Sequence, residues 1–407
     1  MAANANKPSG PAEYEVRVEG HLDNRWADWV EGVTLTHEAD GSTTLRALLP
    51  DQPALHGVLA RMRDLGVPVI SVCRLGDDAG VRRELMQAIV QDAYGTADQL
   101  RLAAIEKPAI RDHEVLVRVH AAGVDAGVWH LMTGLPYLVR LGFGLRRPKH
   151  PVSGMDLAGR VEAVGAAVTR FRVGDEVFGS GVGAFAEYAA VPEDKLARKP
   201  SNISWEQAAS VGNSSAAALK ALRDMAQVQP GQKVLVIGAS GGVGSYAVQI
   251  ATALGAEVTG VASTSKVDLV RSLGAVDVID YTREEITARG IRYDVILDIA
   301  GNRPLSTLRR ALATDGTLVI AGGEGGGKLT GGIDRQIRAQ ILSAFVSQKL
   351  RFFISTVSAD DLELIARMVE DGTVVPSVDR AFPLAKAADA VRYFESGQAR
   401  GKVTITV

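Results

Sequence analysis

A glycine-rich turn between a predicted strand and a predicted helix constrains the fold of this chain more than any other feature. The strand is expected over residues 233–237 and the helix over residues 245–254. The turn between them reads Gly238-Ala239-Ser240-Gly241-Gly242-Val243-Gly244. Glycines in this pattern make a sharp turn, let backbone N–H groups approach a pyrophosphate, and seat the helix on the sheet. The helix N-terminus adds unpaired donors and a partial positive charge. The turn therefore predicts a dinucleotide site, with a purely structural tight turn as the alternative.

The chain around this turn alternates between helical and buried-strand patterns. From about residue 205 to residue 321, apolar runs with helical spacing separate short strand-like runs, and the connections are short. This alternation is typical of a doubly wound parallel sheet. We expect a Rossmann domain over residues 213–344.

The second strand of this sheet ends without the carboxylate that usually binds the ribose hydroxyls of NAD. Ser263, Thr264 and Lys266 stand there instead. A carboxylate would repel a 2′-phosphate by roughly 4 kcal/mol at 4 Å and an effective dielectric of about 20, whereas Lys266 would attract it. We therefore expect NADPH as the cofactor, unless Lys266 is an ordinary solvated lysine. Tyr281, after the third strand, is expected either to flank the adenine or to pack at the sheet edge.

A second glycine-rich stretch, residues 322–328, resembles a phosphate-binding P-loop. Leu329 stands where Ser or Thr would have to hold a magnesium ion, which argues against nucleotide hydrolysis. Gly322 follows a predicted strand and is expected to let the backbone pass close to a nicotinamide ring.

The regions before the Rossmann domain differ from it in pattern. Residues 1–12 are expected to form a flexible tail, and residues 77–84 a linker. Residues 13–76 predict a small α+β module of order β-α-β-β-α-β, with its first helix over residues 24–30. Its expected role is docking to a protein partner or oligomerisation. Residues 85–212 have short strands broken by glycine, which predicts a β-barrel-like domain.

Charge and cysteine content exclude several classes of protein. Lys+Arg is 45 and Asp+Glu is 47, so the net charge of −2 gives no general attraction to nucleic acid or membrane lipid. Cys73 is the single cysteine, which excludes an intrachain disulfide and a four-cysteine zinc site. We find no secretory signal and no apolar run of about 18 residues, and therefore expect a cytoplasmic protein.

Several ordered motifs resemble the signature of the medium-chain dehydrogenase/reductase superfamily. Two of them are the stretches Gly154–Gly165 and Phe171–Gly179. Others resemble its zinc-free quinone oxidoreductase branch: Gly183–Tyr188, the Gly238–Gly244 turn and Ala399–Val403. The resemblance covers about residues 85–407 and leaves residues 1–84 unexplained.

This resemblance implies a GroES-like catalytic domain, residues 85–212 and 345–407, interrupted by the Rossmann domain. The active site would lie in the cleft between the two. Members of this kind use NADPH to reduce quinones or the C=C bond of enones, and many form homodimers through their Rossmann sheet edges. The implied partners are a small-molecule quinone or enone and a second copy of the chain, with no nucleic acid or membrane.

The zinc ligands of alcohol dehydrogenases have no counterpart in this sequence. Residues 121–128 contain no cysteine, and Gly154-Met155-Asp156 replaces the Gly-His-Glu of those enzymes. The histidines of this domain do not share ligand spacing on one element: His113, His120, His130 and His150. No metal is expected.

Reduction of an enone needs a hydrogen-bond donor for the developing enolate oxygen. Related reductases often place a tyrosine near the cleft, and Tyr137 stands at that place in this sequence. A phenol can both donate and supply a proton. The alternative is that Tyr137 packs on an apolar lid. Lys149 is a weaker electrostatic candidate, or else a surface lysine.

Two residues depart from the family pattern. Asp125 stands where relatives commonly carry Asn near the cofactor, and is either an acid/base group or simply exposed. Ala217 stands where relatives show Thr, so Asn213, Ser214 and Ser215 compensate or nicotinamide binding is weaker. Three alternatives to enone or quinone reduction therefore stay open: C=O reduction of the alcohol dehydrogenase type, a non-catalytic NADPH sensor, and a reductase within a biosynthetic assembly.

Overall fold

The computed structural model describes residues 11–22, 33–38, 40–75, 84–301, 303–322 and 327–407. The chain divides into two compact units, residues 1–84 and residues 85–407. The described part of the first unit holds one sheet. The described part of the second holds a seven-stranded sheet, a six-stranded sheet and a separate strand pair.

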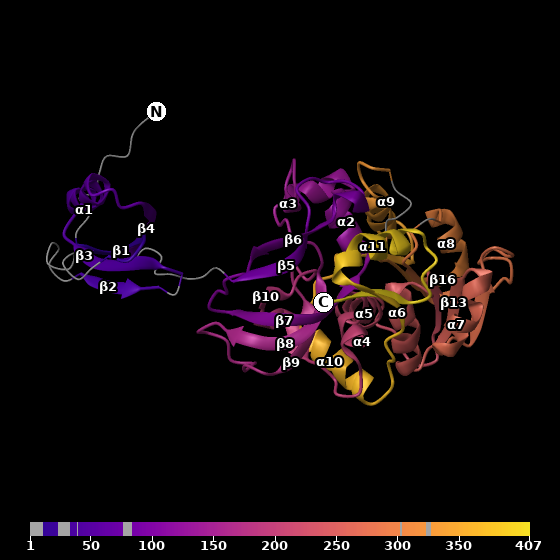
Figure 1. Cartoon of the computed structure of the whole chain (residues 1–407). Coiled ribbons are helices and arrows are strands. Elements are labelled where there is room, and N and C mark those ends of the chain that lie inside the picture. The colour runs from indigo at the N-terminus through magenta and orange to yellow at the C-terminus, as the bar shows by residue number, and fades with distance from the viewer. Residues whose placement is uncertain (1–10, 23–32, 39, 76–83, 302, 323–326) are drawn as a thin grey trace. The chain divides into compact units, whose positions relative to one another are not determined.

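The first unit packs a four-stranded antiparallel sheet against one helix. Its elements are β1 (Ala12–Glu19), β2 (Thr34–His37), β3 (Ser42–Leu49), α1 (Gln52–Asp64) and β4 (Val69–Leu75), with strand order β2-β3-β1-β4 (Figure 1). Alternation along β1 buries Tyr14, Val16 and Val18 in a core shared with Leu55 and Met62 of α1. The strand order is that of a split β-α-β module, which agrees with the predicted α+β class. The helix expected over residues 24–30 lies outside the described residues.

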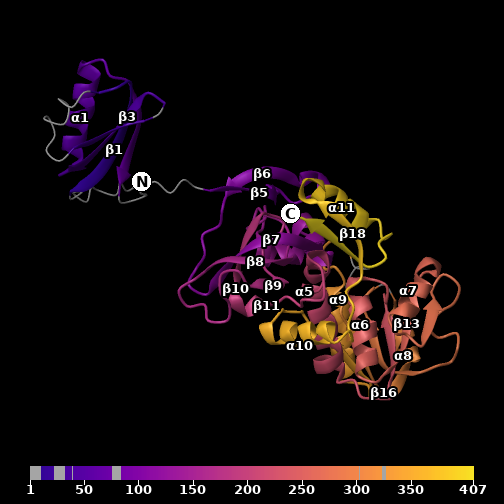
Figure 2. The ribbon, with the colours of Figure 1, turned by 60° about the horizontal axis from the view of Figure 1, so that its bottom comes forward.

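The second unit begins with the strand-rich domain that the sequence predicts. Its strands are β5 (Leu85–Val90), β6 (Arg101–Glu106), β7 (Glu114–Val124), β8 (Asp156–Val164), β9 (Glu176–Ser180), β10 (Tyr188–Pro192), β11 (Leu196–Arg198), β18 (Val378–Pro383) and β19 (Lys402–Thr406). The sheet order is β11-β9-β8-β7-β19-β18, β10 pairs with β7, and β5 pairs with β6. The C-terminal strands therefore return beside β7, as both views show (Figures 1 and 2).

Short helices connect and cover these strands. They are α2 (Ala126–Thr133), α3 (Arg140–Phe143), α4 (Trp205–Ala209), α10 (Ala359–Glu370), α11 (Ala387–Glu395) and the single turns η2 (Ala97–Gln99), η3 (Tyr137–Val139), η4 (Glu193–Lys195) and η7 (Leu384–Lys386). Helix α2 ends at Gly134, whose φ of +62° is a left-handed C-cap that favours glycine. The chain then turns into η3 and α3, which form the segment we call the lid, residues 135–143.

The Rossmann domain follows as six parallel strands with helices between them. The strands are β12 (Lys233–Ile237), β13 (Glu257–Ala262), β14 (Asp277–Asp280), β15 (Tyr293–Asp298), β16 (Leu312–Ile320) and β17 (Lys349–Phe352), in the order β14-β13-β12-β15-β16-β17. The helices are α5 (Gly212–Lys220), η5 (Ala221–Ala226), α6 (Gly242–Ala253), η6 (Thr264–Lys266), α7 (Val267–Ser272), α8 (Leu305–Ala311) and α9 (Ile333–Ser343). Buried residues line both faces of the sheet, so its strands are apolar throughout.

The predicted domain boundary at residue 345 is wrong. Strand β17 pairs in parallel with β16, and its Leu350 is fully buried in the Rossmann core. The chain therefore leaves the Rossmann domain only after Phe352. A strand of four residues has too short an alternation to be recognised before its partner strand is known.

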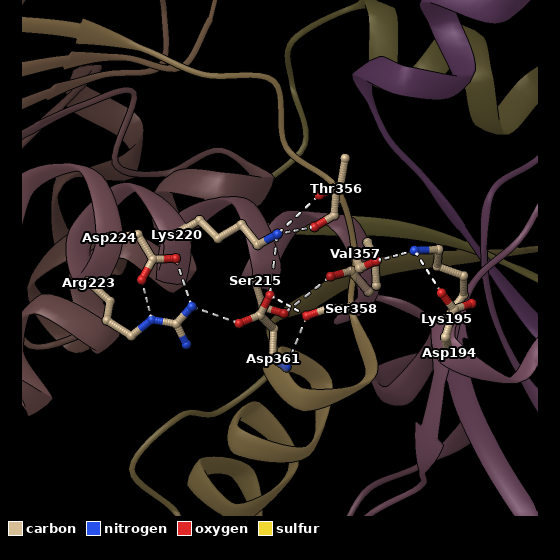
Figure 3. A network of polar contacts seen from close by, with 11 residues as sticks. Asp194, Lys195, Ser215, Lys220, Arg223, Asp224, Thr356, Val357, Ser358 and Asp361 are labelled. Atoms are coloured by element: carbon tan, nitrogen blue, oxygen red, sulfur yellow. Dashed lines mark hydrogen bonds and ion pairs between the residues drawn. The ribbon is translucent and has the colours of Figure 1, made fainter. Parts of the chain in front are cut away.

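The crossover back to the catalytic domain, residues 353–358, is held by side chains from both sides. Lys195 of η4 donates a hydrogen bond from Nζ to the carbonyl oxygen of Val357 at 2.8 Å. Lys220 of α5 donates from Nζ to the carbonyl oxygen of Thr356 at 2.6 Å (Figure 3). Because both lysines bind the same short segment, they tie the two domains together.

Candidate active site

The glycine-rich turn joins β12 to α6 where the strand order reverses. β13 lies on one side of β12 and β15 on the other, the position at which doubly wound sheets bind dinucleotides. Gly238 has a φ of +88°, and a Cβ on Gly244 would lie 2.0 Å from the Gly238 carbonyl oxygen. Gly241 is the N-cap of α6. The turn thus presents backbone and a helix N-terminus without side chains in the way, and its residues fit a pyrophosphate.

A buried carboxylate from the catalytic domain lies close to this turn. Asp156, at the start of β8, is fully buried and accepts hydrogen bonds from the backbone N–H of Asn213 at 3.0 Å and from its Nδ2 at 2.9 Å. Asn213 Nδ2 also donates to Ser180 Oγ at 3.0 Å. Asp156 therefore binds a free N–H group at the start of α5 from a strand of the other domain.

The C-terminal strand contributes a buried cation to the same place. Lys402 of β19 is 2% exposed, and its Nζ donates to Ser214 Oγ at 2.9 Å and lies 3.9 Å from Asp156 Oδ2. A Cβ on Gly242 would lie 3.1 Å from Lys402 Cδ, so this side chain passes directly beside the turn. Its positive charge adds to the attraction of the α6 N-terminus for an anion.

Sequence reasoning did not single out Asp156 or Lys402 as functional residues. Each is a charged residue that begins a strand, and the residues directly after it in that strand are buried. Charged side chains are almost never fully buried unless they are paired. A charge at the first position of each of these strands is the signal that could have found this pair.

Asp125 lies near enough to Asp156 to affect its titration. Burial and, to a smaller extent, the negative charge of Asp125 raise the pKa of Asp156 to about 7, although Lys402 and the Asn213 N–H act to lower it. Asp125 itself accepts a hydrogen bond from the Val128 N–H at 3.0 Å and is the N-cap of α2. Asp125 thus has a structural role as the cap of α2, and its acid/base role stays a prediction.

The residues expected to select the cofactor lie at the ends of β13 and β14. Thr264 Oγ1 donates to Asp280 Oδ2 at 2.5 Å. The hydroxyls of Thr264 and Thr282 lower the pKa of Asp280, so its carboxylate is charged at neutral pH. No carboxylate stands at the end of β13 itself, but the neighbouring strand β14 supplies Asp280 in contact with Thr264. Ser263 lies beside Thr264 at the same strand end.

Lys266 contacts the C-terminal segment of the chain. Its Nζ donates to the Gly397 carbonyl oxygen at 2.9 Å, and burial lowers its pKa. Tyr281 donates its backbone N–H to the Ala262 carbonyl oxygen at 3.1 Å, and its side chain is 53% exposed. The exposed ring at the sheet end remains available to a ligand.

A cavity of about 520 Å³ lies next to α2. Residues of α2, the lid, the loop before α9 and the end of α11 line it: Ala126, Trp129, His130, Leu135, Pro136, Gly327, Lys328, Gly331, Phe394, Glu395 and Gly397. Its size suits a small molecule, and its walls are mainly apolar. Tyr137, Asp125 and Lys149 are not among the lining residues.

The lid places Tyr137 beside this cavity. Its backbone N–H donates to the Lys328 carbonyl oxygen at 2.9 Å, and its ring centroid lies 4.7 Å from Arg140 Cζ. The side chain is 45% exposed. Lys149 is exposed and lines a much smaller cavity with Val128 and other residues. The three predicted catalytic residues therefore do not converge on one point.

Gly322 lies at the carboxyl end of β16. Its N–H donates to the Asp298 carbonyl oxygen at 3.3 Å. A Cβ on Gly322 would lie 1.7 Å from the Ile299 carbonyl oxygen, so only glycine fits. This close approach is made against Ile299, which follows β15, and the predicted approach to a nicotinamide ring stays a prediction.

Within the described ranges, no group of three or more His, Cys, Asp or Glu side chains is arranged to hold a metal ion. Cys73 is exposed in the first unit.

None of the helices described is long and apolar enough to cross a membrane.

Comparison with known proteins agrees with this architecture. The alcohol dehydrogenase GroES-like domain matches residues 111–201, and the zinc-binding dehydrogenase family matches residues 273–405. The NADPH-dependent alkenal/one oxidoreductase of Arabidopsis thaliana is 33% identical over 81% of this chain and 81% of its own length. This chain belongs to the medium-chain dehydrogenase/reductase superfamily. Residues 13–73 match a domain of unknown function, DUF8691.

Other relatives of this superfamily member extend the comparison. Human quinone oxidoreductase is 30% identical over 76% of this chain and 93% of its own length. The polyketide synthase GfsB of Streptomyces halstedii is 36% identical over 78% of this chain, which is only 6% of that protein. The solved quinone oxidoreductase of Pseudomonas syringae pv. tomato is 28% identical, with a TM-score of 0.67, and covers 79% of this chain and 100% of its own. The predicted GroES-like and Rossmann architecture is confirmed.

Proposed function

We propose that this protein is an NADPH-dependent, zinc-independent oxidoreductase that reduces a quinone or the activated C=C bond of an α,β-unsaturated carbonyl compound. The observation that carries the proposal is the glycine-rich turn at the reversal point of the parallel sheet, with the Lys402 cation beside it. Relatives named for alkenal/one and quinone reduction support the substrate class. The single cysteine accords with a cytoplasmic location.

In this proposal the bound NADPH supplies the hydride. The Gly238–Gly244 turn and Lys402 hold the pyrophosphate. Ser263, Thr264 and Lys266 receive the 2′-phosphate, and the exposed ring of Tyr281 flanks the adenine. Gly322 lets the backbone lie close to the nicotinamide.

Tyr137 is the proposed donor to the developing enolate oxygen, with Asp125 and Lys149 as weaker candidates. Tyr137 directly follows Pro136, which lines the 520 Å³ cavity, and its backbone N–H binds Lys328, which lines the same cavity. A phenol there donates a hydrogen bond while charge develops and then supplies the proton.

The proposal is tested by oxidising NADPH and NADH in parallel with a panel of enones and quinones and identifying the products. We expect faster consumption of NADPH and a saturated ketone or a hydroquinone as product. An allylic alcohol would assign C=O reduction instead. Tight NADPH binding without turnover on any acceptor would assign a cofactor sensor.

We also propose that the protein is a homodimer. Strand β17 is the outer strand of the Rossmann sheet. Helix α9 lies against β17, and Ile337, Ile341 and Phe345 on and after this helix are 48%, 59% and 80% exposed. Light scattering on the wild type and on Phe345→Asp tests this, and a wild-type monomer would contradict it.

A further inference from the structure

A second buried ion pair lies in the Rossmann domain, away from Lys402. Asp298, the last residue of β15, is fully buried. Arg335, in the first turn of α9, is 13% exposed, and its Nη2 lies 2.5 Å from Asp298 Oδ2. Removing two charges from water is seldom repaid by their mutual attraction alone. The pair therefore needs an explanation other than stability.

Asp298 holds the carboxyl ends of two strands. Its carbonyl oxygen accepts hydrogen bonds from the N–H groups of Ala321 at 2.9 Å and Gly322 at 3.3 Å, which follow β16. Its Oδ1 accepts from the Gly301 N–H at 3.1 Å. The Asp298 side chain thus holds the backbone after β15, and its main-chain carbonyl binds the backbone after β16.

These backbone segments lie directly beside the glycine-rich turn. The N–H of Ile299 donates to the carbonyl oxygen of Ile237, the residue before the turn, at 3.1 Å. A Cβ on Gly238 would lie 3.4 Å from the backbone nitrogen of Ala300. The residues expected to bind the adenosine half follow β13 and β14, on the other side of β12. A dinucleotide centred on the turn must therefore place its nicotinamide half over β15 and β16.

Arg335 also keeps one donor, Nε, that is buried and has no hydrogen-bond partner among the residues that the structure describes. A buried donor left unpaired is costly, and protein interiors rarely retain one without a reason. Arg335 therefore differs from an arginine whose hydrogen-bond donors are all paired within the fold.

We propose that Asp298 and Arg335 are positioning residues for the nicotinamide half of the dinucleotide. Arg335 orients the Asp298 carboxylate, and this carboxylate sets the backbone of residues 299–301 on which that half rests. This inference rests on the proposed function, because it assumes that the turn binds a dinucleotide.

The test distinguishes binding of the nicotinamide half of the cofactor from binding of the adenosine half. Dissociation constants for NADPH and for 2′,5′-ADP, which lacks the nicotinamide half, are measured on the full chain and on the double variant Asp298→Asn/Arg335→Gln. NADH and ADP are measured in the same way. The double variant removes both charges together and so leaves neither one buried alone. We expect the affinity for NADPH to fall about tenfold and that for 2′,5′-ADP to change less than about twofold.

Arg338→Gln is the matched control. Arg338 lies on the same helix, is 69% exposed and pairs with Asp334, so we expect neither affinity to change. If the double variant does not fold, Arg335→Lys, which keeps the positive charge beside Asp298, replaces it. We expect Arg335→Lys to lose affinity for NADPH and to keep its affinity for 2′,5′-ADP.

Two results would overturn the positioning role while leaving the proposed function intact. One is an equal loss of affinity for NADPH and 2′,5′-ADP, and the other is no loss for either. A wild-type protein that binds none of the four ligands would remove the proposed function and this inference together.

Discussion

Asp156 and Lys402 are the residues whose environment differs most from that of ordinary charged side chains. Both are almost completely buried, and together they join β8, α5 and β19 beside the glycine-rich turn. A buried pair of this kind adds little net stability, but removing one partner leaves an uncompensated charge. Its effects should therefore be visible in pH dependence and in cofactor binding.

Asp156→Asn should remove a pH dependence of stability. The unfolded aspartate loses its proton near pH 4, and Asp156 in the folded chain near pH 7, so between these values the folded state holds the extra proton. The free energy of unfolding of the wild type, relative to the variant, should therefore fall as pH rises from about 4 to about 7, by up to about 1.4 kcal/mol per pH unit. Urea denaturation across this range measures it. A difference between the two proteins that does not vary with pH would contradict it, and Asp268→Asn, at a side chain 98% exposed, is the control.

Asp280→Asn should increase the preference for NADPH over NADH. The carboxylate is held by Thr264, one of the residues expected to receive the 2′-phosphate, and would repel that group. We expect the ratio of kcat/KM for NADPH to that for NADH to rise about tenfold at low salt and less at high salt, because salt screens exposed charges. An unchanged ratio would place the 2′-phosphate elsewhere. Asp277→Asn, on the same strand, is the control.

Tyr137→Phe tests the proposed proton donor. If the phenol donates to the enolate oxygen, kcat should fall about 10²-fold while KM for NADPH stays within about twofold. Tyr94→Phe is a matched control because its ring centroid lies 4.5 Å from the same Arg140 guanidinium. Equal effects of the two substitutions would assign Tyr137 to packing of the lid.

At the scale of elements, the contact between β12 and α6 decides whether the turn can form. The third glycine of the pattern is needed because α6 approaches the first residues of the turn, directly after β12, too closely for a side chain. This constraint comes from packing between backbone segments and not from the ligand.

Gly244→Ala should therefore weaken dinucleotide binding by at least about tenfold and lower the melting temperature. The new Cβ would lie 2.0 Å from the Gly238 carbonyl oxygen, so the helix must shift. Isothermal calorimetry with NADPH and thermal unfolding measure the two effects. Gly57→Ala is the control, because its Cβ would meet nothing within 4 Å in α1, and a gain of about 0.5–1 kcal/mol is expected there. Normal NADPH binding by Gly244→Ala would contradict the assignment of the turn.

At the scale of the whole molecule, the chain consists of two compact units. Residues 85–407 contain both domains of the proposed enzyme, and residues 13–73 match a domain of unknown function. The core of the first unit is formed by its own residues. The catalytic cleft and the N-terminal module are therefore separable by truncation.

A chain of residues 85–407 should fold and keep its turnover of free enones or quinones within about twofold. The reason is that both domains and their buried contacts lie within this unit. Steady-state kinetics on the full chain and the truncated chain measure this. A large loss on free substrates would show that residues 1–84 take part in catalysis, and a loss confined to a carrier-bound substrate would assign them to docking in a biosynthetic assembly.

The sequence by itself determined the class of fold and the cofactor turn. Periodicity of 2 or 3.6 residues and the glycine spacing are local properties, so the Rossmann alternation, the strand-rich β-barrel-like domain and the Gly238–Gly244 turn could be predicted. The GroES-like class of that domain followed from the family resemblance. The tail, the linker and the helix expected over residues 24–30 stay predictions. So do the roles of Tyr137, Asp125 and Lys149.

Only the tertiary structure decided which partners the charged side chains contact. Lys402 Nζ binds Ser214 across 188 positions, Lys266 binds Gly397 across 131, and Thr264 meets Asp280 from a neighbouring strand. No local pattern encodes these contacts, because they depend on which strands become neighbours and on how the C-terminal segment returns to β7. For the same reason β17 could be assigned to its sheet only once its pairing with β16 was known.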